Sequence, residues 1–153
     1  MKKSKACITI LILSIIILTL TFNFYENSKT DYLRIHIRAN EKDGKQALII
    51  VQNEIKKFFD NSLSFLTSYT SARGVLVSSL YELEKQIENA LKNNNIFIVV
   101  DVTVEKMLFS VTEYDNFTCF YGEYETLVII LGGGQGELIN GVLYPNLEFT
   151  SKS

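Results

Sequence analysis

The chain has 153 residues, of which 47% are hydrophobic and 21% are charged, and its net charge is −2. This length is enough for one domain with a modest core. Three of the 15 basic residues lie at the extreme N-terminus, before any acidic residue, so the rest of the chain has 12 basic residues against 17 acidic ones. An acidic body argues against the basic surface that nucleic-acid binding needs, and we predict no nucleic-acid partner.

The N-terminus combines Lys2, Lys3 and Lys5 with an apolar run from Ala6 to Phe24. This pattern is typical of a secretion signal. The run is nearly long enough to span a hydrocarbon layer of about 30 Å, and no clean A-x-A cleavage site follows it. We therefore predict that residues 1–25 form a signal peptide or a membrane anchor, that residues 26–31 form a tether, and that residues 32–153 form a single extracytoplasmic domain. If the segment stays uncleaved, it also attaches the protein to a membrane.

The first strand is predicted at residues 32–38, where apolar and polar side chains alternate. The polar positions hold Arg34, His36 and Arg38. His36 is the sole histidine, and the two positive neighbours favour its neutral form. Because the sequence supplies no obvious partner for a catalytic or metal-binding imidazole, we predict that His36 is an exposed strand histidine.

Two amphipathic helices are predicted next. In the first, apolar residues recur at spacings of three and four from Leu48 to Phe58 or Phe59. A Ser/Thr-rich link follows, and the second helix begins near Ser71. Its apolar stripe ends at Leu91, just before three consecutive asparagines.

The C-terminal half contains the β-strand signals. The longest runs from Ile96 to Phe109, and residues 110–121 are predicted to be a loop or an irregular edge. A second run, from Tyr124 to Leu131, ends in a glycine-rich stretch at residues 132–136, and a third, from Val142 to Tyr144, stops at the only proline. The sequence therefore predicts an α+β fold: an N-terminal signal or anchor helix, one strand, two amphipathic helices and an antiparallel sheet of about three further strands.

The glycine-rich stretch does not match a known phosphate-binding motif. A P-loop needs Lys and Ser or Thr after its last glycine, whereas Glu137 and Leu138 follow Gly136. A dinucleotide fingerprint needs a βαβ unit near the start of a fold. The sequence also lacks zinc-ligand spacing and a nucleophile elbow, so we predict no catalytic residues, no cofactor, no metal and no enzymatic activity. Cys119 is predicted to be a small buried or half-buried side chain, with a redox or intermolecular role as the alternative.

Two signatures in the chain resemble the stage II sporulation protein R family. The C-terminal one lies within Gly122 to Phe149 and comprises Gly122, Tyr124, Leu127, Val128, Gly132, Gly134, Gly136, Val142, Leu143, Tyr144, Pro145, Leu147 and Phe149. The N-terminal one comprises Leu33, Arg34, His36, Arg38, Ala39 and Asn40, then Asp43, Gln46, Ala47 and Leu48. Two signatures at opposite ends, separated by the expected distance, are more specific than either alone.

The chain departs from the family pattern at two places. Where the family has W-W-C, this chain has residues 139–141, Ile-Asn-Gly, and where the family has L-C-F it has residues 147–149, Leu-Glu-Phe. Both signature cysteines are therefore absent together, which avoids leaving one of them as a free thiol.

The resemblance implies an exported signalling ligand that activates a membrane-embedded aspartic protease, which processes a pro-sigma factor during endospore formation. It also implies a location in the space between the two sporulation membranes. The alternative is a secreted envelope-associated binding module with no developmental role.

The predicted partner-contact residues are Glu123, Tyr124 and Glu125, the glycines Gly132, Gly134 and Gly136, and Arg34 and His36 on the first strand. The alternative for the glycine-rich stretch is a purely structural hairpin. If the stretch contacts a partner, replacing Gly134 with Val is expected to impair activation and to spare folding.

Overall fold

The computed structural model describes residues 10–20, 32–39 and 44–150. Internal contacts divide the chain into two units, Met1–Asp31 and Tyr32–Ser153. In the first unit residues 10–20 are helical and exposed, whereas the predicted tether at residues 26–31 lies outside the described residues. None of the helices in the described ranges combines the length and the apolar character needed to cross a membrane.

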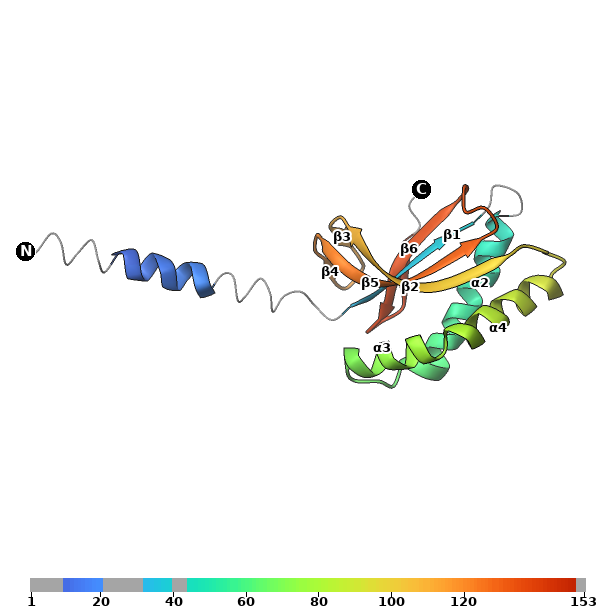
Figure 1. Ribbon diagram of the computed structural model, residues 1–153, viewed down its shortest axis with the longest axis horizontal. Helices are drawn as coiled ribbons and strands as arrows, with labels where there is room; N and C mark the ends of the chain where they lie inside the picture. The colour runs from blue at the N-terminus through green and yellow to red at the C-terminus, as the bar shows by residue number, and fades with distance from the viewer. Residues whose placement is uncertain (1–9, 21–31, 40–43, 151–153) are drawn as a thin grey trace, which may run out of the picture. The chain divides into compact units, whose positions relative to one another are not determined.

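The second unit is an α+β fold, as predicted (Figure 1). Its elements in chain order are β1 (Leu33–Arg38), α2 (Gly44–Phe58), the π-helical turn η1 (Phe59–Leu63), α3 (Tyr69–Ser78), α4 (Leu80–Asn93), β2 (Val100–Phe109), β3 (Thr112–Glu113), β4 (Thr118–Cys119), β5 (Gly122–Leu131), β6 (Leu138–Tyr144) and β7 (Glu148–Thr150).

The sheet differs from the predicted antiparallel one. Its five strands have the order β2-β5-β1-β6-β7, and β3 and β4 form a separate two-stranded sheet. β1 is parallel to β5 and antiparallel to β6, so the main sheet is mixed. The reason is that the N-terminal strand inserts between β5 and β6, and the glycine-rich stretch therefore crosses the end of β1 instead of forming a hairpin.

The second predicted helix is divided into α3 and α4 at Ser79. The Ser79 backbone has φ −102° and ψ 1°, and its N–H donates to the carbonyls of Val75 and Leu76 at 3.1 Å each. α3 begins at Tyr69 because the Ser68 hydroxyl accepts a hydrogen bond from the Ser71 N–H at 3.2 Å.

One apolar cluster joins the helices to one face of the sheet. It includes Ile35 and Ile37 of β1, Val51 and Ile55 of α2, and Ile87 of α4. Figure 1 shows α2, α3 and α4 together on one side of the sheet. On each strand, the residues that alternate with these core residues form the other face of the sheet, which we call the open face. Arg34, His36 and Arg38 lie on this face along β1, which is the central strand of the sheet.

Candidate functional site

The open face has a histidine–asparagine pair at its centre. His36 is half-buried, not exposed as predicted, because neighbouring strands flank β1 on both sides. Its Nδ1 lies 2.9 Å from Asn140 Oδ1 on β6, and the tautomer with a hydrogen on Nδ1 donates to that oxygen. Burial lowers the pKa of His36 below its ordinary value of 6.5, and Arg38 adds to this effect, whereas the Asn140 hydrogen bond and Glu105 oppose it.

The segment containing the β3–β4 hairpin covers one end of the open face, where it encloses Arg34. The Arg34 Cζ lies 4.2 Å from the centre of the Phe109 ring, 5.6 Å from that of Tyr114 and 5.5 Å from that of Tyr124. Aromatic faces attract a guanidinium, which favours this arrangement. Arg34 has no exposed surface, so it is deeply buried although its position in the strand pattern is polar.

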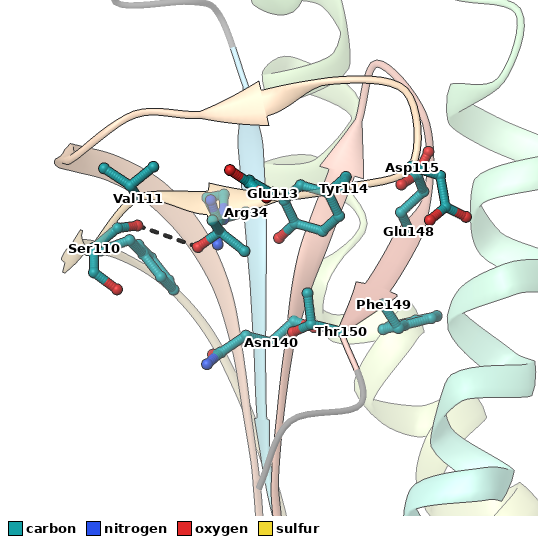
Figure 2. Close-up of a pocket in the computed structure, with 12 residues that line it drawn as sticks. Arg34, Ser110, Val111, Glu113, Tyr114, Asp115, Asn140, Glu148, Phe149 and Thr150 are labelled. Carbon is teal, nitrogen blue, oxygen red and sulfur yellow. Dashed lines mark hydrogen bonds between the residues drawn. The ribbon is translucent and has the colours of Figure 1, made fainter.

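A pocket of about 860 Å³ lies at this end of the open face (Figure 2). Arg34, the hairpin segment at residues 109–115, Asn140 and residues 148–150 form its lining. Burial raises the pKa of Tyr114 to about 12. Cys119 is buried, as predicted, and is a free thiol. Burial raises the pKa of this thiol, whereas the charge of Arg34 and its hydrogen bond lower it.

The predicted contact residues at the start of β5 have different environments. Glu123 is exposed. Tyr124 is buried, and its hydroxyl donates to the Phe120 carbonyl at 2.7 Å. Glu125 accepts hydrogen bonds from the Tyr69 hydroxyl at 2.8 Å and from Arg73 Nε at 2.5 Å. The Arg73 hydrogen bond is the main cause that holds the pKa of Glu125 below its ordinary value. Glu125 therefore connects β5 to α3.

The glycine-rich stretch lies at the other end of β5, about 25–30 Å from Glu123 along a strand that rises about 3.3 Å per residue. Its backbone is bonded to the sheet: the Gly132 N–H donates to the Val99 carbonyl, and the Gly136 N–H to the Ala39 carbonyl, both at 2.8 Å. Gly132 and Gly134 have φ values of 63° and 60°.

Gly134 is restricted by sterics as well as by its backbone conformation. A Cβ on Gly134 would lie 2.9 Å from Ile130 Cγ2. The expectation that Gly134→Val spares folding is therefore wrong. Gly132 and Gly134 have a structural role in the connection between β5 and β6.

The structure brings Arg34 and His36 together on one face and separates the glycine-rich stretch from Glu123, Tyr124 and Glu125. The sequence interpretation missed Asn140, Phe109 and Tyr114. One signal was present, because six of the 18 Phe and Tyr residues fall within residues 109–124. Within the described ranges, no group of three or more His, Cys, Asp or Glu residues is arranged to hold a metal ion.

Comparison with known proteins identifies the family. The sequence model of stage II sporulation protein R matches residues 29–153. Stage II sporulation protein R of Bacillus subtilis (strain 168) is 27% identical over 117 residues, which are 76% of this chain and 52% of that protein. The chain thus spans about half the length of this curated relative, and no solved structure matches. This chain belongs to the stage II sporulation protein R family.

Proposed function

We propose that this protein is an exported signalling ligand that activates a membrane-embedded aspartic protease, which then processes a pro-sigma factor during endospore formation. Family membership supports a role in sporulation. The lysines and the apolar run of residues 1–25 support export. The destination in this proposal is the space between the two sporulation membranes.

Exposed apolar side chains beside the hairpin are the observation that carries the proposed binding role. Leu108, Val111, Phe120 and Tyr121 are 63%, 56%, 59% and 58% exposed. They belong to one segment, and Leu108 pairs with Glu123 of β5, so they border the same end of the sheet. We call these four residues the hairpin rim. A concentration of exposed apolar side chains in one segment is a common mark of a protein–protein contact.

The proposed mechanism is a population shift in the protease. A ligand changes this equilibrium only if it binds the active state better than the idle state. Converting a 1:99 ratio into 99:1 needs about 5.5 kcal/mol of differential binding. Burying the exposed part of one hairpin-rim side chain contributes about 1–2 kcal/mol, so four together contribute roughly 4–8 kcal/mol before ordering costs. The hairpin rim therefore supplies a differential binding energy of the required order if it contacts only the active state, and the upper end of the range meets the requirement.

Complementation of a deletion strain tests the proposal. Deleting the gene should leave the pro-sigma factor unprocessed in sporulating cells, and the wild-type chain should restore processing. Phe120→Glu should fail to restore processing. Its matched control is Phe97→Glu, because Phe97 is 76% exposed and precedes β2, at the end of the sheet opposite the hairpin rim.

Immunoblots must show that both variants are exported at the wild-type level. Normal processing in the deletion strain would contradict the proposal. If processing is normal in that strain and the wild-type protein co-sediments with the envelope in cells that produce it, the envelope-binding module is favoured.

A further inference from the structure

Two neighbouring residues in the pocket hold buried donor groups that no oxygen or nitrogen acceptor of the described residues satisfies. The Cys119 thiol, whose pKa burial raises and a hydrogen bond from Arg34 lowers, is only a weak acceptor. Among the described residues, the buried side-chain nitrogen and oxygen atoms that lack a hydrogen bond are Arg34 Nε, Nη1 and Nη2 and Tyr114 Oη. Both residues line the pocket, and the Arg34 Cζ is 5.6 Å from the centre of the Tyr114 ring. Buried polar groups are normally hydrogen-bonded, so this concentration of unsatisfied donors at one place favours a ligand that carries strong acceptor atoms.

The charge of Arg34 also lacks a close counterion. No ion pair within the described ranges includes its guanidinium, although the side chain has no exposed surface. A buried cation without a paired anion is strongly unfavourable. The contacts with Phe109, Tyr114 and Tyr124 are with aromatic faces, which cannot accept the in-plane N–H groups as a carboxylate does.

We propose that Arg34 and Tyr114 form a binding site for one carboxylate of a partner protein segment. A planar guanidinium donates two parallel hydrogen bonds to a carboxylate, and a tyrosine hydroxyl can donate a third. Figure 2 shows both side chains at the pocket, with Arg34 behind the hairpin strand.

The remaining charges of the pocket restrict the ligand further. Glu113, Asp115 and Glu148 also line it. Three carboxylates repel a dianionic phosphate more strongly than a singly charged carboxylate, and they attract a positive side chain that accompanies the bound carboxylate. The ligand class is therefore a peptide segment in which a carboxylate has Lys or Arg neighbours. This chemistry is independent of which partner supplies the segment, so the inference goes beyond the proposed function.

Ligand entry requires the hairpin to move, because Arg34 has no exposed surface. The hairpin ladder consists of two residue pairs, Thr112 with Cys119 and Glu113 with Thr118, next to a 2.8 Å bond from the Tyr114 N–H to the Phe117 carbonyl. Such a short two-stranded ladder is marginally stable alone, so its own backbone pairing opposes opening only weakly, and opening must also separate the stacked rings of Tyr32 and Phe117. Binding and hairpin displacement are therefore coupled.

Peptide titration of the full-length chain in detergent micelles tests the site. The probe is acetyl-Lys-Ala-Glu-Ala-Lys-amide, and its analogue with Gln in place of Glu lacks only the negative charge. The readout is the NMR signal of the Arg34 Nε–H group. We expect the Glu peptide to shift this signal and the Gln peptide to bind at least ~10-fold more weakly. A third peptide, acetyl-Lys-Ala-Lys-Ala with a free C-terminus, distinguishes a terminal carboxylate from a side-chain carboxylate. Tighter binding of the Glu peptide or of this third peptide than of the Gln peptide supports the site.

The variants separate binding from folding. Tyr114→Phe removes only an unpaired hydroxyl and should weaken the Glu peptide about 10-fold without lowering Tm. Tyr81→Phe is the matched control, because Tyr81 is 68% exposed on α4, and it should bind like the wild type. Arg34→Met should abolish binding and raise Tm, since it removes an unpaired buried cation.

Three results would overturn the site. They are equal affinity for the Glu and Gln peptides, unchanged affinity of Tyr114→Phe, and tighter binding of inorganic phosphate than of the Glu peptide. The titration uses purified protein, so a negative titration would reject the carboxylate site without rejecting the signalling role. Conversely, processing that does not depend on this chain would reject the signalling role without rejecting the carboxylate site.

Discussion

His36 on β1 and Asn140 on β6 lie opposite each other in the sheet, and 2.9 Å separates His36 Nδ1 from Asn140 Oδ1. The pair lies on the open face, half-buried, and burial lowers the pKa of the imidazole below 6.5. In the unfolded chain the same group takes up its proton at a higher pH. The contribution of His36 to stability is therefore present above pH 6.5 and is lost as the pH falls through the lowered value.

His36→Gln should remove this part of the pH dependence. We expect the Tm of the wild type to fall more steeply than that of the variant between pH 7.5 and pH 5, two values that bracket the ordinary pKa of about 6.5. Thermal unfolding followed by circular dichroism across this range measures the difference. Parallel curves for the two proteins would show that the pKa of His36 is the same in the folded and unfolded states.

Gly141 should be the glycine least tolerant of a side chain among those compared in the structure. A Cβ at this position would lie 2.3 Å from the Glu148 carbonyl oxygen and 2.9 Å from Ile35 Cγ2. Gly141→Ala should lower the free energy of unfolding by about 3 kcal/mol, because the β6–β7 pair must separate.

Gly74→Ala is the matched control for Gly141→Ala. Gly74 lies inside α3, and a Cβ there would have no atom within 4 Å. This substitution should raise the free energy of unfolding by about 0.5–1 kcal/mol. Chemical denaturation of both variants provides the measurement, and equal effects of the two substitutions would contradict the packing of β7 against β6.

Two neighbouring glycines of the turn should respond differently to alanine. Gly134 has φ 60° and a Cβ position 2.9 Å from Ile130 Cγ2, so Gly134→Ala should destabilise the fold by about 1–3 kcal/mol. A Cβ on Gly133 would meet only Gln135 Cγ at 4.0 Å, so Gly133→Ala should be neutral. Denaturant midpoints of the two variants measure this. Equal destabilisation would show that the turn has a different conformation.

Gly133→Ala also provides the clean test of a partner contact at the turn, because it adds a methyl group without strain. Loss of sigma-factor processing in this variant, with normal stability, would assign a binding role to the turn.

Glu125→Gln should weaken the connection between β5 and α3. It replaces the carboxylate that accepts hydrogen bonds from Tyr69 and Arg73, and Tm should fall by a few degrees at pH 7. Because the folded-state pKa of Glu125 is lowered from 4.5, its contribution is present above pH 4.5 and is lost as the pH falls below that value. The Tm difference between variant and wild type should therefore disappear in acid.

Glu123→Gln is the control for Glu125→Gln. Glu123 lies 3.9 Å from Lys106, and both side chains are mostly exposed, so the pair should contribute little. A Tm decrease in this control as large as that of Glu125→Gln would contradict the assigned role of Glu125.

Local patterns in the sequence were sufficient to predict β1 and α2, but not the division of the second helix into α3 and α4 or the strands β3 and β4. The alternation at residues 33–38 predicted β1, and the burial of Leu33, Ile35 and Ile37 confirms which side faces the core. The apolar spacing from Leu48 to Phe58 predicted α2. In both segments one side is apolar and the other mostly polar, and that contrast is readable without tertiary information.

Long-range pairing could not be predicted in the same way. The parallel register of Arg34 with Thr126 joins segments 92 residues apart, and no local pattern specifies it. The burial of Arg34 depends on Phe109 and Tyr114, which lie 75 and 80 residues further along the chain. The pattern therefore placed Arg34 on the correct face, but the aromatic cover over that face became visible only in the structure.

Reconstitution in a non-sporulating host provides the most direct test of the signalling role. The protease and its pro-sigma substrate would be produced with or without this chain, and cleavage would be followed on immunoblots. We predict that cleavage depends on the chain, is lost with Phe120→Glu and is retained with Phe97→Glu. Cleavage of equal extent in the absence of the chain would contradict the account.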